Sequence, residues 1–371
     1  MSRRLVSSRL PDFPWDSLAA ARARAVAHEG GLVDLSVGTP VDPTPDVVRD
    51  ALAAASDSPG YPTTVGTTAL RGAVLGWLER RFGVTGLDVH QVLPSIGSKE
   101  LIGSLALHLG IGRGDEVVVP ELAYPTYAVG AALVGADVVV SDAPDLEPVS
   151  PHQDVPALVW INSPANPHGA VMSPGRLTAL VRWARENGVL LVSDECYLEF
   201  GWQDERPSSV LHPDVNGGSV EGLLAVHSLS KRSNLAGYRG AFVAGDAAVV
   251  AELLEVRKNL GLQMPAPQQA ACVAALDDDA HVDEQRARYL SRRARLRPAL
   301  EEAGFTIDHS EGSLYLWATR GEPCRDTVDH LADLGILVAP GDFYGAAGSQ
   351  HVRVALTVTD ERVDAAVARL S

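Results

Sequence analysis

The segment Gly188-Val189-Leu190-Leu191-Val192-Ser193, followed by Asp194, is one of six short apolar runs that decide the fold. The others cover residues 116–120, 136–140, 157–161, 223–227 and 240–244. Such near-continuous β-branched runs suit strands that are buried on both faces. Amphipathic helices lie between them, as in 173–187, where Pro174 stands in the first turn and Gly188 follows the end. The alternation predicts an α/β fold with a mostly parallel sheet between helices.

The last third of the chain follows a different pattern. Helical patterns cover about 247–260 and 280–303, and the second is rich in Arg and Glu, like a solvated connecting helix. Short strands at 314–318 and 351–356 and a helix over 360–370 then predict a smaller α+β domain. We therefore expect a large domain over 42–275 and a small domain over 276–371, with segment 1–41 packed on the small domain.

Bulk composition narrows the class of protein. An apolar content of 46% over 371 residues predicts a folded globular chain. The formal charge of −16 disfavours binding to nucleic acid or to an anionic membrane surface. Three cysteines without CxxC spacing predict neither a disulfide framework nor a zinc site, and no apolar run approaches the roughly 18 residues that span a bilayer. We expect a cytoplasmic protein without a structural metal.

The segment Ser228-Leu229-Ser230-Lys231-Arg232-Ser233-Asn234-Leu235-Ala236-Gly237-Tyr238-Arg239-Gly240 carries the most chemistry. Its amine, Lys231, could form a Schiff base, and a cofactor bound in that way needs a second anchor. Arg239 could hold a phosphate by forked hydrogen bonds, and Ser228 could add a hydroxyl. Each of these residues alone is equally compatible with a surface loop of solvated charges.

Polar groups also follow other predicted strands, where catalytic residues of open α/β sheets gather. Gly97-Ser98-Lys99-Glu100 opens a helix, whose free N–H groups suit a phosphate. Asp194 ends an apolar run and should need a partner such as a protonated ring nitrogen. Ordinary helix capping would explain Ser98 or Asp194 equally well.

Taken together, these motifs resemble those of the class I aminotransferases, which are fold type I enzymes dependent on pyridoxal phosphate. The resemblance rests on Ser-x-Ser-Lys with Gly-x-Arg-x-Gly, on Asp194-Glu195-Cys196-Tyr197, and on Asn162-Ser163-Pro164-Ala165-Asn166-Pro167-His168-Gly169. It spans about residues 35–356. It implies a large domain with a seven-stranded sheet, a smaller α+β domain and a homodimer with composite active sites.

The resemblance also implies roles. Lys231 would carry pyridoxal 5'-phosphate and move the substrate α-proton, while Asp194 would face the ring nitrogen. Asn166 and Tyr197 would bind the ring hydroxyl, and the ring of Tyr124 would stack on the cofactor, although Tyr127 stays an alternative. The phosphate would lie among Gly97, Ser98, Lys99, Ser228, Ser230, Arg239 and a Tyr61 contributed by the neighbouring subunit. Gly38, Asn166 and Arg353 would hold the substrate α-carboxylate.

The runs 227–239, 256–261 and 265–270 resemble actinobacterial succinyldiaminopimelate aminotransferases of lysine biosynthesis. This implies transfer of an amino group from glutamate to N-succinyl-2-amino-6-oxopimelate, giving N-succinyl-LL-2,6-diaminopimelate. The distal carboxylate would need a basic subsite, for which Arg232 and Lys99 are candidates unless both are surface charges. Open alternatives are an aspartate, aromatic or alanine aminotransferase and a C–S β-lyase. A regulatory domain that only binds the cofactor is disfavoured, because the acidic chain leaves no room for a DNA-binding partner domain.

Overall fold

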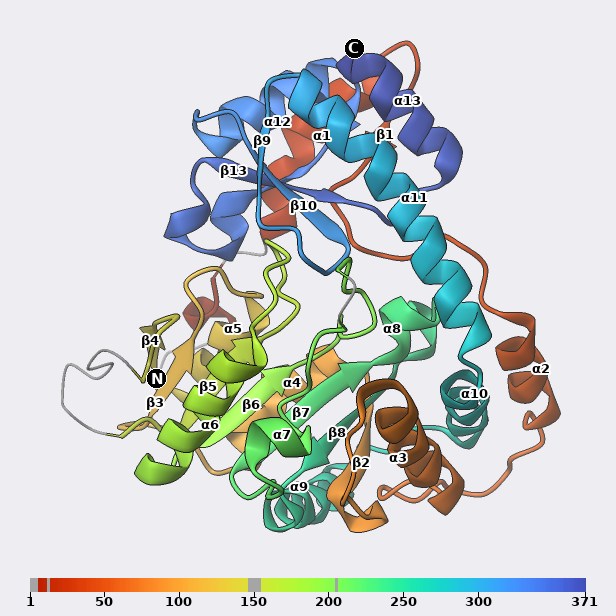
Figure 1. Ribbon diagram of the computed structural model, residues 1–371, viewed down its shortest axis with the longest axis vertical. Coiled ribbons are helices and arrows are strands. Elements are labelled where there is room, and N and C mark those ends of the chain that lie inside the picture. Colours follow the sequence, from red (N-terminus) through yellow and green to blue (C-terminus); the bar gives the residue numbers. More distant parts are fainter. Residues whose placement is uncertain (1–5, 12–13, 146–154, 204–205) are drawn as a thin grey trace, which may run out of the picture.

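The central element is a seven-stranded sheet with strand order β2-β8-β7-β6-β5-β3-β4 (Figure 1). The computed structural model describes residues 6–11, 14–145, 155–203 and 206–371. Only β8 runs antiparallel to its neighbours, so the sheet is mostly parallel, as predicted. Its strands are β2 (Val92–Ile96), β3 (Glu116–Val119), β4 (Asp137–Val140), β5 (Leu158–Asn162), β6 (Leu190–Asp194), β7 (Leu223–Ser228) and β8 (Gly240–Gly245).

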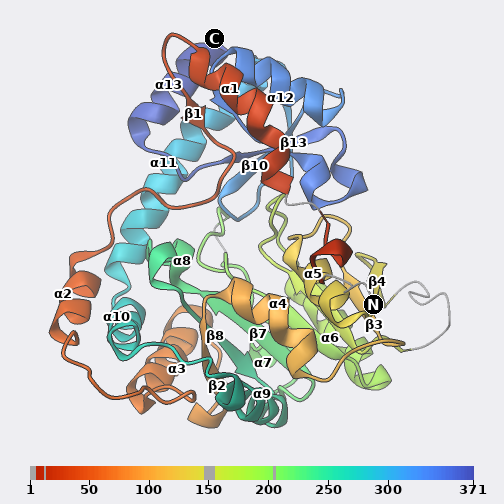
Figure 2. The same ribbon diagram turned by 180° about the vertical axis from the view of Figure 1, so that it is seen from behind.

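Helices cover both faces of this sheet because successive strand residues point to opposite sides. Val117 and Val119 pack with helices α4 (Ser98–His108), α5 (Thr126–Val134) and α9 (Ala247–Leu260), which are seen in Figure 2. Val118 belongs to the core on the opposite face. That core includes residues of α2 (Asp46–Ala54), α3 (Thr68–Phe82), α6 (Pro174–Asn187), α7 (Pro213–Asn216) and α10 (Ala266–Asp277).

The two outer strands differ from the sequence-based expectation. The run 136–140 was expected to be buried on both faces, but β4 is an edge strand in which Val138 and Val140 are 39% and 58% exposed. Strand β2, at the other edge, was not predicted. It contains Pro94, which removes a ladder donor and is tolerated in edge strands.

A second group of elements surrounds a four-stranded sheet, β12-β13-β10-β9. Residues 19–34 pack with it: α1 contacts α12, and β1 pairs in parallel with β11. The exact boundaries at 41/42 and 275/276 stay predictions. The elements are α1 (Ala19–Ala27), β1 (Val33–Asp34), α11 (Ala280–Glu302), β9 (Thr306–Asp308), β10 (Tyr315–Thr319), α12 (Cys324–Asp333), β11 (Ile336–Leu337), β12 (Ala339–Pro340), β13 (His351–Ala355) and α13 (Asp360–Leu370).

The turn between β9 and β10 joins this group to the loops of the large sheet. Gly312 N donates to Gly169 O, and Ser313 N donates to Phe200 O, each at 2.8 Å. A Cβ on Gly169 would lie 2.6 Å from Gly312 O, so the approach needs a glycine at that point. Among the described residues, no helix is long and apolar enough to cross a membrane.

Candidate active site

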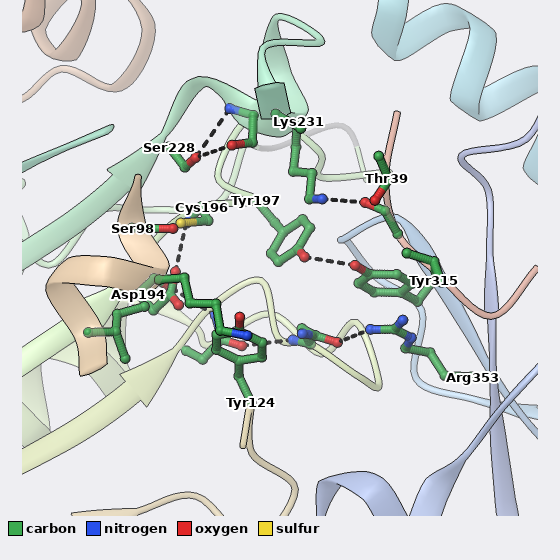
Figure 3. Close-up of a pocket in the computed structure, with 18 of the residues that line it drawn as sticks. Thr39, Ser98, Tyr124, Asp194, Cys196, Tyr197, Ser228, Lys231, Tyr315 and Arg353 are labelled. Atoms are coloured by element: carbon green, nitrogen blue, oxygen red, sulfur yellow. Dashed lines mark hydrogen bonds between the residues drawn. The ribbon is translucent and has the colours of Figure 1, made fainter. Parts of the chain in front are cut away.

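A cavity of about 290 Å³ lies between the two sheets, at the carboxyl ends of the parallel strands (Figure 3). The structure brings most of the predicted site residues to its wall. Gly97 lies directly behind Arg239, whereas Tyr61 is 97% exposed and lies outside the cavity. The predicted residues in the wall are Gly38, Ser98, Lys99, Tyr124, Asn166, Asp194, Tyr197, Ser228, Ser230, Lys231, Arg239 and Arg353.

Lys231 projects into the cavity from the short helix α8 (Leu229–Arg232), which directly follows β7. Its Nζ donates to the carbonyl oxygen of Gly38, a residue of the N-terminal segment. Burial lowers the pKa of the Lys231 ammonium, and Arg353 adds to this effect by repulsion. A lowered pKa makes the neutral amine, the form that can act as nucleophile and base, easier to reach.

One end of the cavity is built to receive an anion. Gly97 caps α4 with φ +86°, and a Cβ there would lie 2.0 Å from Nη2 of Arg239. Ser98 is the first helical residue, so its hydroxyl and the free N–H groups of the first turn border the same space. Ser228, which donates to Ser230 Oγ at 2.8 Å, also lines the cavity.

Asp194 is the last residue of β6, and its carboxylate is 5% exposed. Its Oδ2 accepts from Tyr127 Oη at 2.7 Å, and its Oδ1 accepts from Cys196 N at 3.1 Å. Burial raises the pKa of Asp194 even though these hydrogen bonds oppose the rise. A cation in the cavity would compensate this buried charge. Tyr127 is buried behind Asp194, stacked on Trp160, so Tyr124 is the tyrosine that lines the cavity.

The other end of the cavity holds a buried guanidinium. Arg353 on β13 donates to Asn166 Oδ1 at 2.9 Å and to Ser36 O at 2.7 Å. Its Nε has no hydrogen-bond partner among the described residues, and the side chain is almost fully buried. A buried arginine held only by neutral acceptors can still bind a carboxylate.

Arg232 does not reach the cavity, which corrects its candidacy for a distal-carboxylate subsite. Neighbouring residues in a helical turn point about 100° apart, so Arg232 leaves α8 on the side away from Lys231. It is 3% exposed, donates to Ala275 O at 2.8 Å, and lies 3.5 Å from Glu199 Oε1. Lys99, by contrast, lines the cavity.

Other wall residues were not predicted from the sequence. Cys196, given no role between Asp194 and Tyr197, borders the cavity, as do Trp15 and Tyr315. Tyr315 lies within the apolar run Leu314-Tyr315-Leu316-Trp317, which is typical of a core strand, so nothing in the pattern indicates a site residue.

The residues present fit one chemical group well. An anion cup, a buried carboxylate with a raised pKa and an amine with a lowered pKa match the phosphate, the ring nitrogen and the aldehyde of pyridoxal phosphate. No group of three or more His, Cys, Asp or Glu that could hold a metal ion occurs in the part of the chain that the structure describes.

The fold and the site together define an enzyme of the aminotransferase type. The model of the family "Aminotransferase class I and II" matches residues 31–370, and the chain belongs to this family, whose members depend on pyridoxal phosphate. The chain is 62% identical over 366 residues to a probable aminotransferase of Mycobacterium tuberculosis, covering 99% of this chain and 86% of that protein.

A second relative is 4-dedimethylamino-4-oxo-anhydrotetracycline transaminase OxyQ of Streptomyces rimosus, 59% identical over 98% of this chain and 99% of that protein. Among solved structures, N-succinyldiaminopimelate aminotransferase of Mycobacterium tuberculosis matches with a TM-score of 0.88 and 26% identity, covering 100% of this chain and 99% of that one.

Proposed function

We propose that the protein transfers the amino group of an amino acid to a 2-oxo acid, with glutamate and 2-oxoglutarate as one substrate pair. The observation that supports this most is the position of Lys231. Its amine lies in the same cavity as Asp194 and Arg353, the two charged side chains that such a reaction needs (Figure 3).

Bound pyridoxal phosphate would supply an electron sink for the substrate α-carbon. Arg239, Ser228, Ser230 and the Gly97-Ser98 helix entry would hold its phosphate, and Asp194 would keep the ring nitrogen protonated. Asn166 and Tyr197 would bind the ring hydroxyl, with Tyr124 against the ring face.

The remaining steps belong to the side chains at the other end of the cavity. Arg353 would orient the substrate by its α-carboxylate, with the Gly38 backbone beside it. Lys231 would then take the proton from the α-carbon, a role that the lowered pKa of its ammonium favours.

For the finer substrate we propose N-succinyl-2-amino-6-oxopimelate. The structural similarity to N-succinyldiaminopimelate aminotransferase of Mycobacterium tuberculosis supports this. With Arg232 buried, Lys99 is the remaining candidate from the sequence for the distal carboxylate, and it borders the cavity.

A second candidate substrate class is a large cyclic oxo compound. A groove of about 890 Å³ shares Tyr124 with the cavity and is lined mainly by apolar groups, among them Pro125, Val138, Val140 and Phe343. Such a groove could take up the rings of a bulky apolar substrate. The 59% identity to OxyQ, whose name states a tetracycline substrate, favours the same class.

The test is a substrate panel with purified protein. The acceptors are 2-oxoglutarate, N-succinyl-2-amino-6-oxopimelate and a polycyclic ketone, and the donors include glutamate, aspartate, alanine and aromatic amino acids. We expect the holoenzyme to absorb visible light and Lys231→Ala to lose both the band and transamination, whereas Lys258→Ala, on the exposed side of α9, keeps both. A colourless protein after incubation with the cofactor would refute the proposal. Pyruvate released without an acceptor would indicate a β-lyase instead.

We also propose that the enzyme acts in the cytoplasm as a homodimer with shared active sites. Support comes from the three free cysteines and from the position of Tyr61, which is fully exposed in one chain although its family counterpart contacts the cofactor phosphate.

A further inference from the structure

Tyr315 is the first residue of β10 and is 2% exposed. Its phenol points into the cavity toward Tyr197, which comes from the loop after β6 (Figure 3). The two hydroxyl oxygens are 2.8 Å apart, which is an ordinary hydrogen-bond length. The contact joins a residue of β10 to the loop after β6, and the two side chains are 118 positions apart in sequence.

Gly38 makes room for this phenol. A Cβ at position 38 would lie 2.0 Å from the Tyr315 hydroxyl oxygen, so any larger residue there would displace the ring. The carbonyl of the same glycine accepts from Lys231 Nζ. The Tyr315 hydroxyl, the Gly38 backbone and the reactive amine therefore meet at one point of the cavity.

Arg353 lies on the ring of Tyr315, with its guanidinium carbon 4.0 Å from the ring centroid. The register of β10 and β13 explains this contact: Trp317 is opposite Arg353 and Tyr315 is opposite Ala355, two residues away on each strand. Burial alone would raise the pKa of the Tyr315 phenol, but Arg353 and Lys231 bring that pKa below its ordinary value. The pKa of the Tyr197 phenol is raised well above its ordinary value, chiefly by burial.

We infer that Tyr315 is a positioning residue: its hydroxyl orients the Tyr197 hydroxyl toward the ring oxygen of the cofactor, and its ring fixes the plane of Arg353. The inference rests on the proposed function. A phenol has one proton to donate and two lone pairs. When Tyr197 donates to the cofactor, its oxygen can accept the Tyr315 proton, and this second hydrogen bond strengthens the first. Tyr315 then connects Arg353, which would bind the substrate carboxylate, with Tyr197, which would bind the cofactor ring.

The experiment is a pH titration of the visible absorption of the bound cofactor in the holoenzyme. Tyr315→Phe keeps the ring under Arg353 and removes only the hydroxyl. Weaker donation by Tyr197 leaves more negative charge on the ring oxygen, so the chromophore should hold its proton to higher pH, by about half a unit. Gly38→Ala should shift the titration in the same direction, because its methyl group would displace the Tyr315 hydroxyl.

Tyr289→Phe is the matched control, since Tyr289 is a fully buried tyrosine on α11 whose ring packs on Phe200. We expect it to titrate like the wild type. If Tyr197→Phe shifts the titration while Tyr315→Phe and Gly38→Ala do not, the inference is wrong and the proposed function stands. A wild-type protein without a visible band would refute both.

Discussion

At the scale of single residues, two charged side chains of the site, Asp194 and Arg353, are almost fully buried. Asp194 has a raised pKa because it is buried, and its hydrogen bonds from Tyr127 and Cys196 only partly offset the burial. A group with this environment destabilises the empty protein and becomes favourable when a cation binds.

Asp194→Asn should therefore stabilise the cofactor-free protein and strongly reduce the activity of the holoenzyme. Well below pH 3.8 the carboxyl is protonated in both the folded and the unfolded chain, so the free energy of unfolding does not depend on its titration there. As pH rises from 3.8 to the higher folded pKa, the unfolded chain releases its proton first and the free energy of unfolding falls. At pH 7 we expect a higher Tm for the cofactor-free variant and a kcat/KM lower by about 100-fold or more.

The control is Asp283→Asn. Its hydrogen bond to Arg81 lowers the pKa of Asp283, so the same substitution should lower Tm at pH 7. An Asp194→Asn protein that is less stable than the wild type at pH 7 would contradict the assignment of Asp194 as an uncompensated buried charge.

The sequence indicated the charged residues of the site better than their neutral partners. Lys231, Asp194 and Arg353 stand in or next to apolar strand patterns, where a charge is conspicuous. Tyr315 and Trp15 have no such signal, because aromatic residues are ordinary members of a core. Arg232 was misjudged because adjacency in sequence to Lys231 does not imply a shared direction on a helical turn.

At the scale of elements, the anion end of the cavity depends on how one helix begins. Gly97 has a positive φ, and Arg239 occupies the space that a side chain at position 97 would fill. Gly97 is therefore required for both backbone geometry and close packing. The sequence predicted the helix start at Gly97-Ser98, but not β2, whose five residues and internal proline give a weak strand pattern.

Gly97→Ala should weaken cofactor binding without unfolding the protein. The methyl group would push Arg239 away from the cup, so we expect the Kd of the cofactor-free protein for pyridoxal phosphate to rise about tenfold or more. Gly103→Ala, inside the same helix, meets only Thr126 Cγ2 at an ordinary 3.5 Å and should bind normally. Fluorescence titration measures both values. Equal affinities for the two variants would exclude Gly97 from the phosphate cup.

At the scale of the whole molecule, the cavity lies between two sheets and is contributed by both. The small sheet supplies Arg353 and Tyr315, the end of β6 and the turn after β7 supply Asp194 and Lys231, and the N-terminal segment supplies Gly38. Strand and helix order predicted a mostly parallel sheet and a smaller α+β domain, but the sequence could not place Tyr61, whose expected contact lies in a second chain.

Subunit mixing tests that contact. If the protein is the proposed homodimer, Lys231→Ala should be inactive and Tyr61→Ala weakly active, and unfolding and refolding them together should restore activity. Half of the randomly mixed dimers contain both variants, and one of their two sites is intact, so recovery should approach about a quarter of the wild-type sites. Mixing Lys231→Ala with Arg239→Ala should restore nothing, because both residues belong to one chain's site. No recovery in the first mixture would place Tyr61 outside the partner's site.

The antiparallel pairing of β7 and β8 also bears on the order in which contacts around the cavity form during refolding. It brings Arg239 back to the edge where Lys231 lies, only eight positions further along the chain. Asn166 and Arg353, which meet at the other end of the cavity, are 187 positions apart. Contacts close in sequence form faster than distant ones, because less chain entropy is lost. During refolding, the approach of Arg239 to Lys231 should therefore form before the contact between Asn166 and Arg353.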